Sequence, residues 1–115
     1  MPTRRASKLD FKRAMAVLGK PGGRQLGFLQ EHFSAPGRAS TAGNLARAAG
    51  YQNYRAINLH YGGLAKRIAG VLGIKGVGIE LLVEGNEPLR ITNEHWVLSM
   101  RPEFADALSE LGWVK

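Results

Sequence analysis

The chain has 115 residues, 44% of them hydrophobic, and carries a formal net charge of +7 with no cysteine. This length and composition predict a single globular domain over residues 1–115 and exclude disulfides and cysteine-based zinc sites. No apolar run approaches the roughly 18–20 residues that a membrane span requires, and the N-terminus lacks a signal-peptide pattern. We therefore expect a cytoplasmic protein that has no membrane partner.

The charge is unevenly distributed along the chain. Residues 1–75 contain 13 Lys/Arg and 2 Asp/Glu, a balance of +11, whereas residues 76–115 contain 3 and 7, a balance of −4. The sequence pI of about 10.3 indicates a polyanionic partner, of which nucleic acid is the commonest. The alternative at this level is a basic protein that binds nothing in particular.

Two helices are predicted before residue 40. The first follows a flexible basic arm over residues 1–8, with Ser7 as its cap and Asp10 in its first turn. The second covers residues 24–33. Its expected buried side chains are Leu26, Leu29 and Phe33.

Residues 40–72 have the layout of a helix-turn-helix. Ser40 or Thr41 caps a short helix over residues 42–49, Gly50 ends it, and Asn53 caps a longer helix over residues 54–72. One apolar stripe of the long helix must face the core. Its members are Ile57, Tyr61, Leu64, Ile68 and Leu72.

The spacing of this stripe indicates a turn longer than that of the tight motif. Starting from Ala46 and Gly50, a tight motif would place core residues at positions 56 and 59, whereas the chain offers Ile57 and Tyr61. The turn is therefore expected to be one or two residues longer, as is common in winged-helix variants.

If this motif binds DNA, the N-terminal half of the long helix enters the major groove. Arginine can form two hydrogen bonds to guanine, and Asn or Gln to adenine. The predicted base contacts are Gln52, Asn53, Arg55 and Asn58. The predicted contacts to the DNA backbone are Arg4, Arg5, Arg38, Arg47, Lys66 and Arg67.

Gly62 and Gly63 lie inside the predicted long helix. Each glycine there costs roughly 1 kcal/mol relative to alanine. Close approach of a nucleic-acid backbone, close packing on a neighbouring helix or a kink would offset this cost. Of the three, close packing is the expected explanation.

Residues 79–92 predict a β-hairpin, because residues 79–84 alternate in a period of two and residues 85–88 have turn chemistry. The return strand would be residues 89–92. Glu84 and Glu87 at the tip would repel phosphate, which argues against a wing that touches DNA. Residues 96–100 fit a further strand or a short helix capped by Thr92 or Asn93.

A terminal helix is predicted over residues 102–112, beginning at Pro102 and followed by Trp113 folding back. The fold class is thus α+β: mostly helical, with a helix-turn-helix core, a C-terminal β-hairpin in a winged-helix-like arrangement, and a final short helix.

The sequence offers no catalytic constellation. His32, His60 and His95 have no metal-ligand spacing, and the serines lack a nucleophile setting. We predict a protein that is not an enzyme and has no catalytic residue, no metal and no cofactor.

The string Gly50–Ala65 resembles a small bacterial domain that occurs alone and beside HNH-type nuclease modules. The likeness covers about a third of the chain, including the terminal segment Ala107–Trp113. Within the string it is carried by Gly50, Tyr51, Asn53, Ala56, Asn58, Tyr61, Gly62, Leu64 and Ala65. It implies a DNA-targeting or defence-associated role, but no nuclease activity, because the chain has no His-Asn-His constellation of its own.

The leading hypothesis is a sequence-reading or structural protein that binds double-stranded DNA, linked to restriction, defence or transcriptional regulation. The alternatives are a protein-interaction module that docks on an acidic partner or forms a homodimer, and an RNA-binding protein. The absence of RNP-type aromatic strand motifs disfavours RNA without excluding it.

Overall fold

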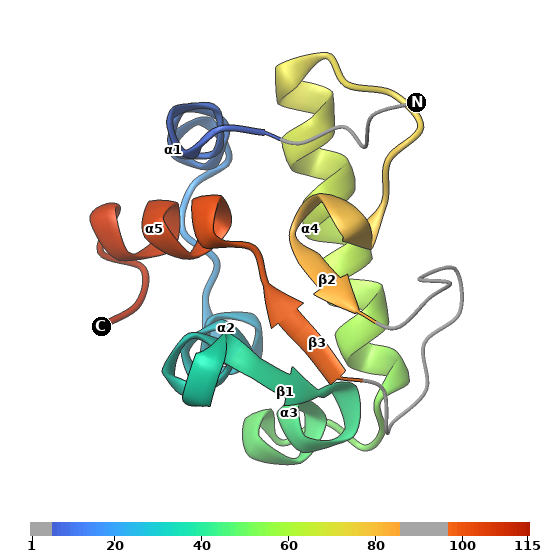
Figure 1. Ribbon diagram of the computed structural model, residues 1–115. Helices are drawn as coiled ribbons and strands as arrows, with labels where there is room; N and C mark the ends of the chain where they lie inside the picture. The colour runs from blue at the N-terminus through green and yellow to red at the C-terminus, as the bar shows by residue number, and fades with distance from the viewer. Residues whose placement is uncertain (1–5, 86–96) are drawn as a thin grey trace.

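The computed structural model describes residues 6–85 and 97–115. These residues form an α+β fold of helices around one small antiparallel sheet (Figure 1), which confirms the predicted class. The α-helices are α1 (Lys8–Leu18), α2 (Gly23–Ser34), α3 (Ala42–Ala49), α4 (Arg55–Leu72) and α5 (Pro102–Glu110). The strands are β1 (Ala39–Thr41), β2 (Val83–Gly85) and β3 (Val97–Met100), with two 3-10 helices, η1 (Pro36–Arg38) and η2 (Ile79–Leu81).

α1 begins with the predicted cap. The Asp10 amide donates to Ser7 Oγ and the Ser7 amide donates to Asp10 Oδ2, both at 3.1 Å, so the two residues satisfy each other's backbone donors. Ala6 is buried, and Lys8 forms a 2.7 Å ion pair with Glu110 of α5. The flexible arm predicted over residues 1–8 is therefore wrong for its last three residues, which the fold holds in place.

The sheet has the order β1-β3-β2, and both pairings are antiparallel. Residues 97–100 therefore form a strand, which settles the choice between strand and helix for this part of the chain. The central strand β3 pairs Leu98 with Ser40 on one side and with Gly85 on the other. The predicted return strand at residues 89–92, together with Glu87, His95 and Trp96, lies outside the described residues.

The strand predicted from residue 79 is wrong over its first half, where the chain forms η2. Leu81, Leu82 and Val83 are all fully buried, so three consecutive side chains face the core instead of alternating between two faces. The Arg101 backbone amide donates to Leu82 O at 2.9 Å, which joins this turn to the start of α5. A period of two could not reveal the turn, because Leu82 occupies a position that the alternation assigned to the outer face.

α4 runs along one side of the molecule, with α3 near its beginning and α1 packed near its end (Figure 1). Its predicted core stripe is confirmed at four positions that are buried and at Leu72, which is half-buried. The four buried residues are Ile57, Tyr61, Leu64 and Ile68. Within the described ranges, no helix has both the length and the apolar character needed to cross a bilayer.

α5 begins at the predicted residue but ends at Glu110, two residues earlier than predicted. Pro102 is the first residue of α5, where its missing amide hydrogen costs no hydrogen bond. Phe104 and Leu108 are fully buried, and the ring centroids of Phe104 and of Phe11 in α1 are 5.5 Å apart. The Trp113 amide donates to Leu108 O at 3.0 Å, which folds the buried Trp113 back onto the helix.

Candidate nucleic-acid interface

α3 and α4 form a helix pair joined by residues 50–54. Thr41 caps α3 by accepting a 3.0 Å hydrogen bond from the Asn44 amide, and Gly50 ends it with a φ of 82°. Ile57 and Tyr61 occupy the core positions of α4 with no exposed surface. The longer turn predicted from their spacing is therefore confirmed.

α4 begins one residue later than predicted, and Tyr54 occupies the N-cap position in place of the predicted Asn53. Its first residue is Arg55, and Asn53 Oδ1 accepts a hydrogen bond from the Arg55 amide at 2.9 Å. Asn53 thus satisfies one of the free donors at the beginning of the helix. Both Asn53 and its neighbour Gln52 are exposed, as a base contact requires.

The outward face of α4 is basic. Arg55, Lys66 and Arg67 are exposed, α4 contains no acidic residue, and the described residues form no ion pair with these three cations. Leu59 lies on the same face with 74% of its surface exposed. Asn58 differs from the other predicted base contacts, because it is half-buried and its Oδ1 is buried without a hydrogen-bond partner among the described residues.

The predicted close packing at Gly62 and Gly63 is wrong. A Cβ atom added at Gly62 would have no neighbour within 4 Å, and at Gly63 it would meet only the Arg67 guanidinium at 3.9 Å. Gly70, two turns further along α4, is equally open. No neighbouring element of the described fold therefore requires these glycines.

Replacing Gly62 with alanine is expected to raise the free energy of unfolding by about 0.5–1 kcal/mol, because alanine loses less backbone entropy in a helix and would meet no neighbour. Urea denaturation measures the change. Gly70→Ala is the matched control and should stabilise the protein by a similar amount. A loss of stability confined to Gly62→Ala would show that an intramolecular contact needs the glycine.

The predicted backbone contacts differ in their availability. Arg38, in the left-handed conformation with φ of 53°, lies 3.9 Å from the centroid of the Phe33 ring and donates to Phe33 O at 2.9 Å. Its guanidinium is thus committed to the end of α2. Arg47 is exposed and donates to Asn44 Oδ1 within α3. Arg4 and Arg5 lie outside the described residues.

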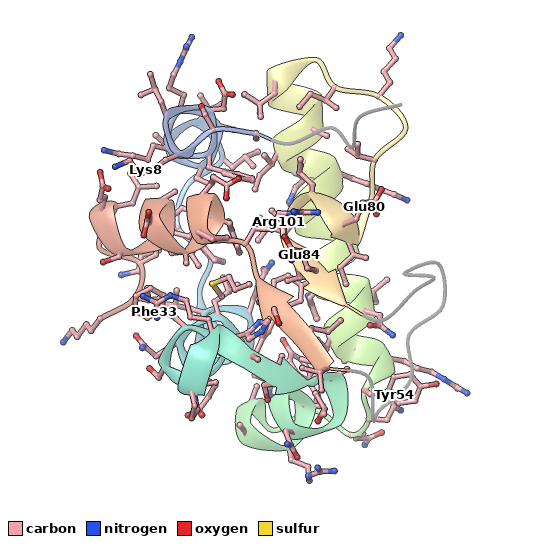
Figure 2. All side chains as sticks on the ribbon, in the orientation of Figure 1. Lys8, Phe33, Tyr54, Glu80, Glu84 and Arg101 are labelled. Carbon is pink, nitrogen blue, oxygen red and sulfur yellow. The ribbon has the colours of Figure 1, made fainter. Side chains whose placement is uncertain are left out.

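Glu84 does not present a free charge to a phosphate. Its Oε1 accepts a 2.8 Å hydrogen bond from Arg101 Nη1, and Arg101 Nε donates to Glu80 O at 2.7 Å (Figure 2). The Arg101 side chain is only 8% exposed, whereas that of Glu84 is 56% exposed. The predicted repulsion between the hairpin and a DNA phosphate is therefore weaker at Glu84, because its carboxylate is paired with Arg101.

A stack of side chains that the sequence did not reveal connects α2, the turn and α4. The Arg24 guanidinium lies 5.9 Å from the centroid of the Tyr51 ring, and Tyr51 stacks on His60 with ring centroids 5.2 Å apart. The buried Phe28 lies on the core side, with its ring centroid 6.3 Å from the centroids of both Tyr51 and His60. Burial raises the pKa of the Tyr51 hydroxyl, and the charge of Arg24 partly opposes this shift.

A second missed feature is a buried histidine at the junction of α2, α4 and β3. His32 has no exposed surface; its Nδ1 lies 2.5 Å from Tyr61 Oη and its Nε2 lies 2.8 Å from Leu98 O. A carbonyl oxygen only accepts hydrogen bonds, so Nε2 carries the proton and Nδ1 accepts from Tyr61. Burial lowers the pKa of His32, while interactions with the backbone of Leu98 and Arg38 oppose this shift, and burial raises the pKa of Tyr61.

Among residues 6–85 and 97–115, no three His, Asp or Glu side chains gather in a way that could hold a metal ion. Comparisons with family models, curated proteins and solved structures found no match. The resemblance of Gly50–Ala65 to a nuclease-associated domain stays a prediction.

Proposed function

We propose that the protein binds duplex DNA and places the exposed face of α4 in the major groove. The observation that carries this proposal is the acid-free outward face of α4, with Arg55, Lys66 and Arg67 unpaired by the described residues. The helix is held from behind by its buried stripe, so its outer side is presented rigidly. Rigid presentation of the helix favours base reading, because little backbone entropy is lost on binding.

The order of the elements supports the same proposal. A winged-helix domain has a helix, a strand, a helix-turn-helix and then a hairpin whose second strand pairs with the first strand of the domain. Here α2, β1, α3, α4, β2 and β3 follow in that sequence, and β3 lies between β1 and β2. In such domains the second helix of the pair enters the groove, and here that helix is α4.

We assign base contacts to the beginning of the exposed face of α4 and phosphate contacts to the residues further along it. Arg55 lies in the first turn, beside Gln52 and Asn53, where base edges would be reached. Lys66 and Arg67 lie about three turns further along and would contact phosphates. Asn58 remains a proposed base contact, although its buried Oδ1 would require a side-chain rotation.

Duplex binding is tested by fluorescence anisotropy on a labelled random-sequence pool and on sequences selected from it. The dissociation constant should rise steeply between about 50 and about 200 mM salt, because each phosphate contact releases condensed counterions. Absence of binding at low salt would overturn the proposal. Tighter binding to structured RNA than to duplex DNA would replace it with RNA recognition.

Arg55→Ala is expected to relax sequence preference, with a loss of about 1–3 kcal/mol on the selected sequence and a smaller loss on random duplex. Lys66→Ala should weaken binding to both about equally. Lys115→Ala is the charge-matched control for Lys66→Ala, because Lys115 is an exposed lysine far along the chain from α4. Equal behaviour of the Arg55 and Lys66 variants on the two sequences would contradict the division of roles.

A further inference from the structure

Arg24 lies where the turn of the helix pair begins. It is exposed in the first turn of α2, and a Cβ atom added at Gly50 would lie 3.9 Å from Arg24 Nε. Gly50 is the residue that ends α3. The cation is therefore next to the element that leads into α4, although it is separated from α4 by more than 30 residues of sequence.

The contact with Tyr51 restricts where the Arg24 guanidinium can go. A cation within about 6 Å of an aromatic ring face is attracted by the ring, and the planar guanidinium stacks better than an ammonium would. Tyr51 is in turn held by His60 and Phe28. An exposed arginine that is held in this way loses less freedom when it binds a phosphate.

The same side of α4 continues to a second arginine. His60, Gly63 and Arg67 follow at spacings of three and four residues, which places them in one row along the helix. The row begins beside Tyr51, where Arg24 supplies a cation, and ends at the exposed Arg67. Neither arginine has an ion pair with the described residues.

We infer that Arg24 is a phosphate contact of the DNA interface, with Tyr51 as the residue that positions it. The inference rests on the proposed function and adds α2 to the surface that binds DNA. The sugar-phosphate backbone of one DNA strand would pass over Arg24 and Tyr51 and then over Arg67. Its ligand is the phosphodiester of duplex DNA, because the row of residues has an exposed arginine at each end and no acidic residue.

The test is the salt dependence of duplex binding by Arg24→Ala, compared with Arg13→Ala. Arg13 is exposed on α1 and has no ring contact in the described structure, so both variants lose one charge. Arg24→Ala should make the negative slope of the logarithm of the association constant against the logarithm of the salt concentration shallower by about 0.9. The ratio of the wild-type to the variant association constant should therefore fall about 3.5-fold between 50 and 200 mM salt. Arg13→Ala should leave the slope unchanged.

The role of Tyr51 is tested with two replacements, each checked for folding by urea denaturation. Tyr51→Phe keeps the ring and should bind as wild type does. Tyr51→Leu should weaken binding, and the loss should disappear in the Arg24→Ala background, because a positioning residue acts only through its partner. An equal loss in both backgrounds would overturn the positioning role.

These outcomes separate the two proposals. A wild-type protein that does not bind duplex DNA overturns both. Wild-type binding with equal slopes for the Arg24 and Arg13 variants overturns only the inference about Arg24. A lower slope for Arg24→Ala alone, with unchanged stability, supports it.

Discussion

Replacing His32 with leucine is expected to lower the free energy of unfolding by about 3 kcal/mol near pH 8. The imidazole bonds to both Tyr61 Oη and Leu98 O in a site with no exposed surface, so its removal leaves two buried polar atoms each short of one hydrogen bond. Each such atom costs roughly 1–3 kcal/mol. Urea denaturation of wild type and variant measures the difference.

A double substitution isolates the hydrogen bonds from the loss of packing. Tyr61→Phe alone should destabilise the protein, because His32 Nδ1 loses its donor. In the His32→Leu background the same change should be neutral or stabilising, since it removes a hydroxyl that has already lost its partner. Additive losses would show that the bond between the two side chains contributes nothing specific.

The same histidine sets the expected pH dependence. Its folded-state pKa is lowered from the ordinary value of 6.5, so below pH 6.5 the unfolded chain binds a proton that the folded protein resists. The stability contributed by neutral His32 is present above pH 6.5 and is lost as the pH falls from there toward the lowered value. The His32→Leu variant lacks this titration, so the difference in free energy of unfolding between wild type and variant should shrink as the pH falls toward 5.

Replacing Arg101 with methionine is expected to lower the free energy of unfolding by about 2 kcal/mol. Methionine can fill the volume of the arginine stem, but the Glu80 carbonyl loses its 2.7 Å donor and Glu84 loses its cation. Because the Glu84 side chain is 56% exposed, water can solvate it afterwards, and most of the loss should come from the carbonyl. Thermal or urea unfolding measures the change.

Glu84→Gln is the control for Arg101. It keeps an acceptor beside Arg101 Nη1 but removes the negative charge from a cation that is 8% exposed. A loss smaller than that of Arg101→Met is expected, because the bond to Glu80 O remains. A neutral Arg101→Met variant would mean that this link between η2 and α5 adds no stability.

The helices were predictable because their signals are local. Ser7 and Asp10 cap α1 within four residues, and the apolar stripe of α4 repeats at helical spacing. The exposed cations of α4 follow from the same periodicity, since residues opposite a buried stripe face solvent. The amino-acid sequence alone therefore suffices to place Arg55 and Lys66 on the solvent side of this helix.

The remaining features depend on contacts between distant residues, which local patterns cannot report. Arg38 was predicted to reach a phosphate, and its contacts with the Phe33 ring and the Phe33 carbonyl could not be foreseen from the local pattern. His32 is not recognisable as buried, because its partners are 29 and 66 residues away. Arg24 gave no signal for the same reason, since the Tyr51 ring is contributed by the turn after α3.

The position of β3 in the sheet has a consequence for synthesis on the ribosome. β3 is the central strand, yet it is encoded after both of its neighbours, so within the described sheet β1 and β2 have no partner until residues 97–100 have emerged. Leu98 O, the acceptor for His32, arrives at the same moment. α2, α3 and α4 can pair earlier, because their contacts are closer in sequence. The nascent chain therefore carries a nearly complete helical half with two open strand edges, and one late four-residue segment closes both.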